Sequence, residues 1–295
     1  FALTQGSSAI RSLHRVPLAG GTAIQLSARL VEGGEIINTF RITPDGTTVI
    51  YEADQETDGQ RELFRVPIGG GSVTRLNPPL APGEIAANFR ISPDSRTVVY
   101  QRFDVAGPAE LFSASLESGE VVQLNAPLGS NEQVLSFEIS HDSRFVLYAN
   151  VIRFLVPPGA KHAVVAPKGF LAPPHGLFRV PIGGGAVQTL ADGFPTGSGL
   201  GGLQLSPDDA QVFYKADQDS AGVFELYAVP SDGGTAQKLS APLVSGGNVF
   251  SFEIGPDGTT LVYRADQDTD DVFELYGVAN IEAPLPLRIF SNSFE

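Results

Sequence analysis

The sequence predicts an all-β fold: a six-bladed β-propeller of four-stranded antiparallel blades, with the first blade incomplete at the N-terminus. Three observations support this prediction. A motif that runs through a Pro-Asp turn recurs with a period of about 48 residues along the chain. Each copy holds short apolar segments separated by turn residues. The 33 glycines and 22 prolines suit many tight turns better than they suit helices.

The elements of one repeat follow from its residues. A short apolar first strand runs into a Pro-Asp-Gly or Pro-Asp-Ser turn, and a β-branched second strand ends in tyrosine. A third strand reads Glu-Leu-Phe or Glu-Leu-Tyr, and a glycine turn leads to a fourth strand. The first residues of the five full copies are expected to be buried on the innermost strands: Phe40, Phe89, Phe137, Leu203 and Phe252. The tyrosines are expected to pack between blades.

The whole chain, 1–295, is predicted to be one propeller domain. Residues 1–39 align with the end of a second strand, a third strand and a fourth strand, so this blade has no first strand. The blades are predicted near 1–39, 40–88, 89–136, 137–202, 203–251 and 252–290. The fourth repeat carries an inserted loop, 151–176, and the chain ends in a tail, 280–295.

The Ser-Pro-Asp-Gly turn, the strand that ends in tyrosine and the Glu-Leu-Tyr strand recur in this order over nearly the whole chain. In this they resemble the Pro-Asp repeats of TolB-like propellers, relatives of the WD-type blades. The resemblance implies the propeller fold, and because such propellers serve many roles it does not imply one function. The Ile-Phe and Phe-Glu pairs of the tail resemble the endings of some secreted bacterial proteins.

The composition limits the expected location of the protein and the classes of partner that it can bind. The formal net charge of −14 argues against nucleic acid, which attracts clustered lysine and arginine. No apolar run is long enough to span a membrane. Cysteine and methionine are both absent, which excludes disulfides and thiolate chemistry and suits an oxidising exterior. We therefore expect a secreted, extracellular protein, or alternatively a periplasmic one.

No pattern typical of a catalytic site occurs in the sequence. There is no nucleophile elbow, and the histidines do not form a metal-binding pair on a helix. The glutamate of the third strand repeats from blade to blade, whereas a catalytic residue is normally unique, so a structural role is predicted for Glu62, Glu110, Glu225 and Glu274. The sequence therefore predicts no catalytic residue and no enzyme.

Acidic loops follow the second strands of three repeats. The most acidic one offers Asp266, Asp268 and Asp270 at alternate positions, a spacing that suits hard cations such as Ca²⁺. The alternative is that these aspartates only satisfy the backbone of solvated turns. A calcium site is one hypothesis here, and no other cofactor is expected.

The inserted loop 151–176 combines basic and apolar residues and has no acid. Long loops in compact domains are usually functional or disordered, and a strongly apolar exposed loop suggests a contact surface. The residues expected to make this contact are Arg153, Phe154, Lys161, Lys168 and Phe170.

The tail carries a first-strand pattern. Leu287 and Ile289 flank an arginine as the apolar residues of Phe-Arg-Ile do in two blades, and Phe290 follows them. We expect this segment to pair with the open edge of the first blade, within one chain or in the next molecule. The second route would build a head-to-tail filament.

These observations favour a non-catalytic extracellular module for protein interaction or assembly, with copies of the same chain among its partners. Two alternatives remain open. One is a TolB-like periplasmic recognition domain, and the other is a propeller lyase or hydrolase that acts in the central funnel.

Overall fold

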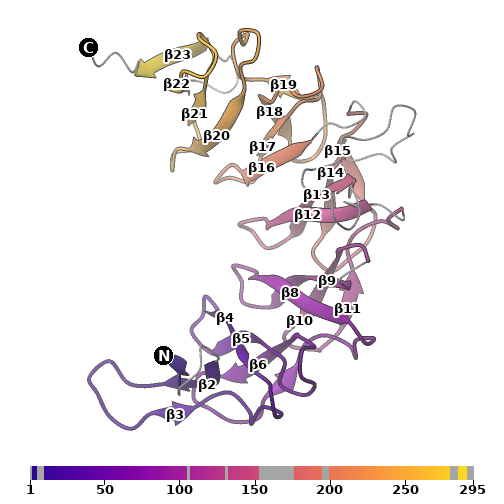
Figure 1. Cartoon of the computed structure of the whole chain (residues 1–295), viewed down its shortest axis with the longest axis vertical. Coiled ribbons are helices and arrows are strands. Elements are labelled where there is room, and N and C mark those ends of the chain that lie inside the picture. Colours follow the sequence, from indigo (N-terminus) through magenta and orange to yellow (C-terminus); the bar gives the residue numbers. More distant parts are fainter. Residues whose placement is uncertain are drawn as a thin grey trace. The chain divides into compact units, whose positions relative to one another are not determined.

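The computed structural model describes residues 2–4, 10–104, 107–129, 132–152, 176–194, 199–279 and 285–290. These residues form short antiparallel strands joined by turns, without a helix, as Figure 1 shows. The strands group into successive sheets of the propeller type, which confirms the predicted fold class. In the described part of the chain, no helix has the length and apolar character needed to cross a membrane.

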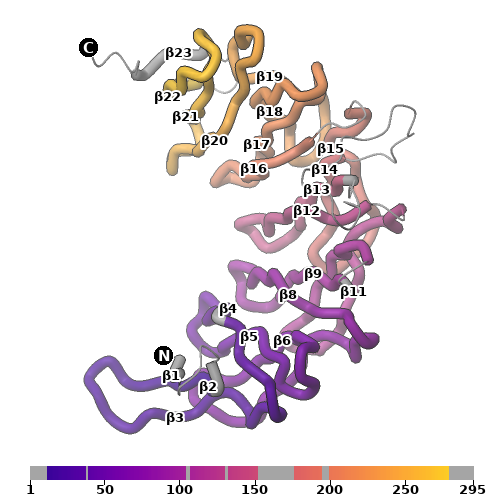
Figure 2. Tube along the Cα trace, viewed as in Figure 1, coloured from indigo at the N-terminus to yellow at the C-terminus, as the bar shows by residue number. Residues whose placement is uncertain are grey.

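The chain divides into two compact units. The first comprises residues 1–125 with 182–185, and the second comprises 126–181 with 186–295. In Figure 2 the colours follow the chain from indigo in the first unit to yellow in the second.

The first blade contains three strands: β1 (Ala2–Thr4), β2 (Ile10–Arg15) and β3 (Ile24–Gln25). Strand β2 lies between the other two, and Ala2 pairs with Leu13. This register is the one that joins second and third strands in the next blade, where Glu52 pairs with Leu63. The first blade therefore holds a second, third and fourth strand, and no described strand pairs with the other edge of β1.

Two full blades complete the first unit. They are β4 (Ile36–Ile42), β5 (Thr48–Ala53), β6 (Glu62–Pro67) and β7 (Thr74–Arg75), then β8 (Glu84–Ile91), β9 (Thr97–Asp104), β10 (Glu110–Ser115) and β11 (Val121–Gln123). A single pairing, Ile10 with Ile36, connects β2 to β4.

Three blades form the second unit. They are β12 (Glu132–Ile139), β13 (Phe145–Ile152), β14 (Gly176–Pro181) and β15 (Gln188–Ala191); β16 (Leu200–Leu205), β17 (Gln211–Ala216), β18 (Glu225–Pro230) and β19 (Gln237–Lys238); and β20 (Val249–Ile254), β21 (Thr260–Ala265), β22 (Glu274–Ala279) and β23 (Leu285–Phe290). In each blade the strands pair in sequence order.

The Ser-Pro-Asp turn explains how first and second strands meet. The Ser206 hydroxyl donates to Asp208 Oδ1 at 2.6 Å and accepts the backbone N–H of Gln211 at 2.9 Å. The hydroxyl of Ser206 and backbone N–H groups lower the pKa of Asp208. The turn is therefore closed by its own side chains before any packing between blades.

The core lies between successive blades. Each full blade stacks the tyrosine of its second strand on an aromatic residue of its third strand, with ring centroids 5.1–5.8 Å apart. The pairs are Tyr51–Phe64, Tyr100–Phe112, Tyr148–Phe178, Tyr214–Tyr227 and Tyr263–Tyr276. Tyr263 and Tyr276 share one cluster with Phe213 and Leu226 of the preceding blade, which confirms the predicted packing.

Four of the five first-strand residues are buried as predicted: Phe89, Phe137, Leu203 and Phe252. The prediction is wrong for Phe40, whose side chain is 39% exposed. Phe252 is covered because it lies against Gly202, on the first strand of the preceding blade. Phe40 has no such cover, since the described strands of the first blade do not include a first strand.

Within the chain the tail pairs with another strand than the predicted one, and its pairing with a neighbouring molecule stays a prediction. Strand β23 pairs with β22, for example Leu287 with Gly277, and forms the fourth strand of the sixth blade. The tail is itself the fourth strand of the sixth blade, so the chain does not have to cross to another blade after β22 before the tail can pair. A short connection to the adjacent strand then suffices to form a hairpin.

Candidate functional site

Five side chains of the fifth and sixth blades form a surface that we call the aromatic–cation patch: Lys215, Phe224, Phe250, Arg264 and Phe273. Lys215 on β17 and Arg264 on β21 directly follow the buried tyrosines of their strands. Because neighbouring strand residues point to opposite faces, the two cations point away from the tyrosine face. Phe224 and Phe273 each precede the glutamate of a third strand.

The patch is held together by ring and cation contacts. The Arg264 guanidinium carbon lies 4.5 Å from the ring centroid of Phe273 and 5.8 Å from that of Phe250. These two rings meet edge to face, with centroids 4.6 Å apart. Lys215 Nζ lies 5.5 Å from the ring centroid of Phe224 and donates to the carbonyl oxygen of Phe250 at 2.7 Å. One continuous set of contacts therefore spans both blades.

Two of the three rings are exposed, and Phe224 is half-buried. Phe250 is 40% exposed and Phe273 is 36% exposed. A glycine sits beneath one edge of the patch, because a Cβ on Gly199 would lie 2.9 Å from Phe224 Cζ. The bare backbone of Gly199 thus allows the Phe224 ring to lie close to the chain.

The cations of the patch have no acidic partner. In the described part of the chain neither Lys215 nor Arg264 forms a salt bridge, whereas Lys238 lies 2.6 Å from Asp219 and 2.8 Å from Glu225. Burial lowers the pKa of Lys215. Two uncompensated cations stand out in a chain of net charge −14.

This arrangement suits a ligand that is both flat and anionic. Aromatic faces offer apolar contact, and the cations attract carboxylate or sulfate groups. A guanidinium group stacked on a ring keeps its N–H donors at the edge of the ring, where they can meet an oxygen.

Sequence reasoning missed the patch because it concentrated on what the repeats share. The signal lies where they differ. The residue after the second-strand tyrosine is Lys215 in the fifth blade and Arg264 in the sixth, but Glu52 in the second and Gln101 in the third. In the fifth and sixth blades, which carry the cation, a phenylalanine also precedes the third-strand glutamate.

The first aspartate of each acidic loop has a structural task. Asp217 accepts the backbone N–H groups of Gly199 and Gly222, both at 2.6 Å. Asp54 accepts those of Glu35 and Gly59 in the same way. Each carboxylate therefore ties its own loop to the segment before the first strand, as expected for a turn that satisfies local backbone.

The same clamp occurs at Asp266, yet this loop also gathers three carboxylates. Oxygens of Asp266, Asp270 and Asp271 lie within 4.8 Å of one another, a grouping that could hold a metal ion. Asp266 and Asp270 were expected in such a group, while Asp271 takes the place expected for Asp268. Asp266 is buried and Asp270 and Asp271 are exposed, so an ion would reach the group from solvent.

The repeated glutamates have the structural role predicted for them. Glu62 lies 3.2 Å from Arg75, and Glu110 lies 2.7 Å from Arg102. Burial raises the pKa of Glu62. Glu274 accepts the hydroxyl of Tyr276 at 2.7 Å.

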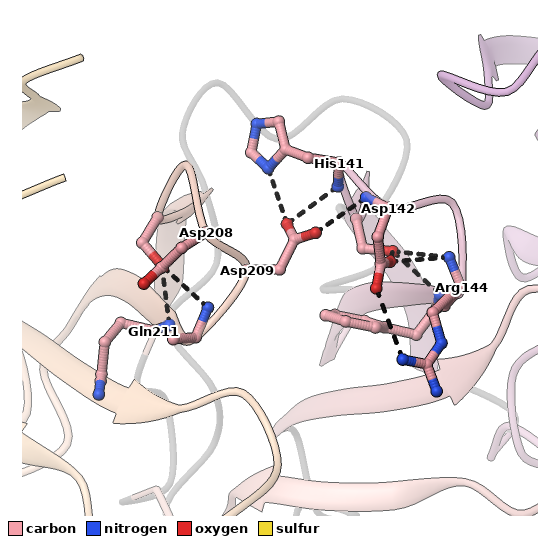
Figure 3. Close-up of polar contacts among 10 residues, drawn as sticks. His141, Asp142, Arg144, Asp208, Asp209 and Gln211 are labelled. Carbon is pink, nitrogen blue, oxygen red and sulfur yellow. Dashed lines mark hydrogen bonds and ion pairs between the residues drawn. The ribbon is translucent and has the colours of Figure 1, made fainter. Parts of the chain in front are cut away.

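The turns of the fourth and fifth blades are joined by a His–Asp contact, shown in Figure 3. Asp209 Oδ1 lies 2.7 Å from His141 Nδ1 and accepts the His141 backbone N–H at 2.9 Å, while Oδ2 accepts that of Asp142 at 2.9 Å. A related contact joins the second and third blades, where Ser95 Oγ accepts the N–H of Asp45 at 3.0 Å. A residue of this turn in the later blade therefore bonds to the equivalent turn of the blade before it in both cases.

The residues expected to make contacts lie mostly outside the described part of the chain. This holds for Arg153, Phe154, Lys161, Lys168 and Phe170. For Leu287, Ile289 and Phe290 the structure describes the backbone of β23.

Comparison with known proteins adds the fold. No protein-family model and no curated protein matches the chain. A solved oligogalacturonate lyase in complex with manganese is 15% identical, covers 95% of this chain and 72% of its own, and has a TM-score of 0.58. A second oligogalacturonate lyase, from Vibrio parahaemolyticus, is also 15% identical, covers 95% of this chain and 72% of its own, and has a TM-score of 0.55. A prolyl endopeptidase structure is 13% identical, covers 91% of this chain but 38% of its own, and has a TM-score of 0.57.

These likenesses show the β-propeller fold and correct one expectation. The prediction that the chain is not an enzyme is contradicted, because structures that share its fold include lyases and prolyl endopeptidases. Repeated blades therefore do not argue against catalysis. TolB from Acinetobacter baumannii also overlaps the chain, with a TM-score of 0.43, which carries no argument for that family in particular.

Proposed function

We propose that this chain is a recognition propeller that works outside the cytoplasm and binds an anionic oligosaccharide. The observation that carries the proposal is the aromatic–cation patch, where Lys215 lies over the half-buried ring of Phe224 and Arg264 over the exposed ring of Phe273, and neither cation has an acidic partner among the described residues. Carboxylates of acidic sugars would pair with the two cations, and the apolar faces of the sugar rings would lie on Phe250 and Phe273.

The charge distribution favours an acidic sugar over a nucleic acid. A phosphate backbone needs many clustered cations, and this chain has 19 lysines and arginines against 33 acids. An acidic sugar needs few cations at defined places, combined with aromatic surface. The likeness to oligogalacturonate lyases supports the same ligand class.

The proposed location rests on composition. The chain contains no cysteine and no methionine, so it has no sulfur to oxidise. An acidic surface also keeps a protein soluble at high concentration. A periplasmic or extracellular place fits both features.

A second candidate function is a lyase that acts on the same ligand with a divalent cation. It is favoured by the group of Asp266, Asp270 and Asp271 and by the manganese complex of a lyase with this fold. In this candidate the ion would neutralise a carboxylate of the sugar, which makes the neighbouring proton easier to remove. Calcium is another ion that all-oxygen ligands suit.

Calorimetry with oligogalacturonate and with a neutral oligosaccharide of equal length tests the proposal. We expect binding of the acidic sugar alone, weakened by salt. Lys215→Ala and Arg264→Ala should each lower affinity about 10- to 100-fold, since a hydrogen bond to a charged group contributes about 1.5–3 kcal/mol. The matched control is Arg144→Ala, an arginine whose side chain is 82% exposed.

Equal binding of both sugars, or an equal effect of the control variant, would contradict the recognition proposal. Ultraviolet absorbance of unsaturated sugar ends, followed with Mn²⁺ and with chelator, tests the second candidate in the same samples. Product that forms with Mn²⁺ and stops with chelator supports the lyase. Binding of the acidic sugar without product supports the recognition function and contradicts the lyase.

A further inference from the structure

One position of the first strands reaches the surface in all three blades of the second unit. It lies two residues before the buried core residue of the strand, and it is occupied by Leu135 in β12, Gly201 in β16 and Phe250 in β20. The pairing with the second strand skips Leu135 and Phe250, as it does at a β-bulge, which redirects a side chain. Leu135 is 47% exposed and Phe250 is 40% exposed. We call these three residues the first-strand row.

The exposure belongs to the position in the blade, whether or not another blade follows. Leu135 lies in the fourth blade, which the fifth blade follows, and it is more exposed than Phe250 in the sixth. Strand β16 lies between β12 and β20 and contacts both, as Figure 1 shows. The first-strand row therefore runs across three consecutive blades, with an apolar side chain at each end and glycine at its centre.

Gly201 leaves the centre of the row open. Among the described residues, a Cβ on Gly201 would have only Lys215 Cε within 4 Å, at 3.7 Å. Gly201 also lacks the positive φ of Gly202, so its backbone conformation does not call for glycine. Glycine inside a strand weakens it and often marks a place where a ligand approaches the backbone closely. Neither packing nor conformation explains this glycine, and a ligand lying on its backbone does.

Lys215 borders the open centre and supplies its charge. It pairs with Gly201 across β16 and β17, and directly paired residues of an antiparallel ladder share one face of the sheet. Its Nζ donates to the carbonyl oxygen of Phe250 at 2.7 Å, which holds the ammonium group between the centre and one end of the row. An ammonium group has three N–H donors, so two remain for a ligand. Lys215 forms no salt bridge within the described part of the chain.

We propose, on the basis of the function proposed above, that Gly201 is the specificity-determining residue of the oligosaccharide site. One acidic sugar unit lies flat on the bare backbone of Gly201 with its carboxylate on Lys215. The units before and after it lie on Leu135 and Phe250, whose exposed apolar surfaces they cover. The site therefore selects a chain of acidic sugar units over a single unit, because a single unit can meet only one position of the row.

A larger side chain at Gly201 tests the open centre. Gly201→Leu fills it and keeps Lys215, and calorimetry with hexagalacturonate should show affinity lowered about tenfold or more. Gly69→Leu is the matched control, because Gly69 also lacks a positive φ and has nothing within 4 Å of its would-be Cβ. We expect it to bind as the unmodified chain does. Melting curves monitored by circular dichroism show whether each variant is folded, and Gly201→Ala carries the test if the leucine variant is not.

Chain length tests the ends of the row. Leu135→Ala should lower the affinity for hexagalacturonate about threefold to tenfold, because it removes apolar surface that the longer chain covers. The same variant should bind single galacturonate, followed by NMR titration, as the unmodified chain does, since a single unit is held at Gly201 and Lys215. Leu18→Ala, at a fully exposed leucine of the first blade, is the control and should change neither affinity.

The outcomes distinguish this inference from the proposed function. If the unmodified chain binds no acidic sugar, the proposed function fails and the role of Gly201 fails with it. If the chain binds hexagalacturonate and Lys215→Ala weakens the binding while Gly201→Leu does not, recognition stands and the role of Gly201 is overturned. Equal losses for Gly201→Leu and Gly69→Leu, or equal affinity of the unmodified chain for galacturonate and hexagalacturonate, would also overturn it.

Discussion

The ring of Phe252 lies directly over the backbone of Gly202, so close that a Cβ on Gly202 would stand 2.8 Å from Phe252 Cε1. The two residues belong to the first strands of neighbouring blades, β20 and β16. Gly202 also has a positive φ of 64°. The contact shows how consecutive blades interlock at the innermost strand: an aromatic residue of one fits onto bare backbone of the other.

Truncation of the interlocking ring should be costly. Phe252→Ala is expected to lower the free energy of unfolding by about 3–5 kcal/mol, because it leaves a cavity in the cluster between two blades. Phe40→Ala is the matched control at the equivalent, exposed position and should cost less than about 1 kcal/mol. Urea unfolding measures both. Similar losses for the two variants would show that exposure at Phe40 does not reflect its packing.

A methyl group at Gly202 should separate strain from collision. Gly202→Ala and Gly46→Ala both place alanine at positive φ, which costs about 1–2 kcal/mol. Gly46 has open space around its would-be Cβ, whereas Gly202 faces the ring. We expect Gly202→Ala to be worse by a further ~1–3 kcal/mol, the usual range for overpacking. Adding Phe252→Leu should recover part of that difference, and no recovery would mean that the ring is not the obstacle.

The sequence predicted the repeating parts of this fold because they rest on local chemistry. The Ser206–Asp208 turn and the Tyr263–Tyr276 stack involve residues close in sequence or in paired strands, and five copies of the pattern reinforce one another. The registers of blade one were also predictable, by alignment with blade two.

Other features depend on what surrounds a residue in space. Phe40 has the sequence context of a core residue, and only the strands next to it determine that it is exposed. The tail has a first-strand pattern, yet a nearby edge on β22 takes it as a fourth strand. The aromatic–cation patch could not be predicted from the sequence, because its residues are far apart in sequence and occupy positions that vary among the repeats.

The acidic loop of the sixth blade offers a sharp test of cation binding. If it holds Ca²⁺ or Mn²⁺, about 10 mM of the ion should raise the melting temperature and chelator should reverse the rise, because a ligand of the native state stabilises it. Asp270→Asn and Asp271→Asn should abolish the shift, since the structure groups these residues with Asp266. Asp268→Asn should abolish it only if the spacing read from sequence is the correct one. A shift that survives Asp270→Asn would place the ion elsewhere.

Buried Glu52 should make stability depend on pH in a direction opposite to that of most acids. Its side chain is 4% exposed, and its Oε1 accepts the backbone N–H of Asn88 at 3.0 Å. Burial raises the pKa of Glu52 above 4.5, an effect that the Asn88 hydrogen bond and the charge of Arg61 reduce but do not cancel. The folded state then binds this proton more tightly than the unfolded state. The Glu52 contribution to the free energy of unfolding therefore falls as pH rises from about 4.5 through the raised pKa.

The variant Glu52→Gln removes this penalty and keeps an oxygen for the Asn88 N–H. We expect it to be more stable than the unmodified protein at pH 7 and no more stable at pH 4, where Glu52 is mainly protonated in the folded and the unfolded state alike, as urea unfolding at the two pH values would show. Glu253→Gln, at an exposed glutamate on β20, serves as control and should show no such difference. An equal gain for Glu52→Gln at both pH values would mean that shape or hydrogen bonding, and not the buried charge, sets the stability at this position.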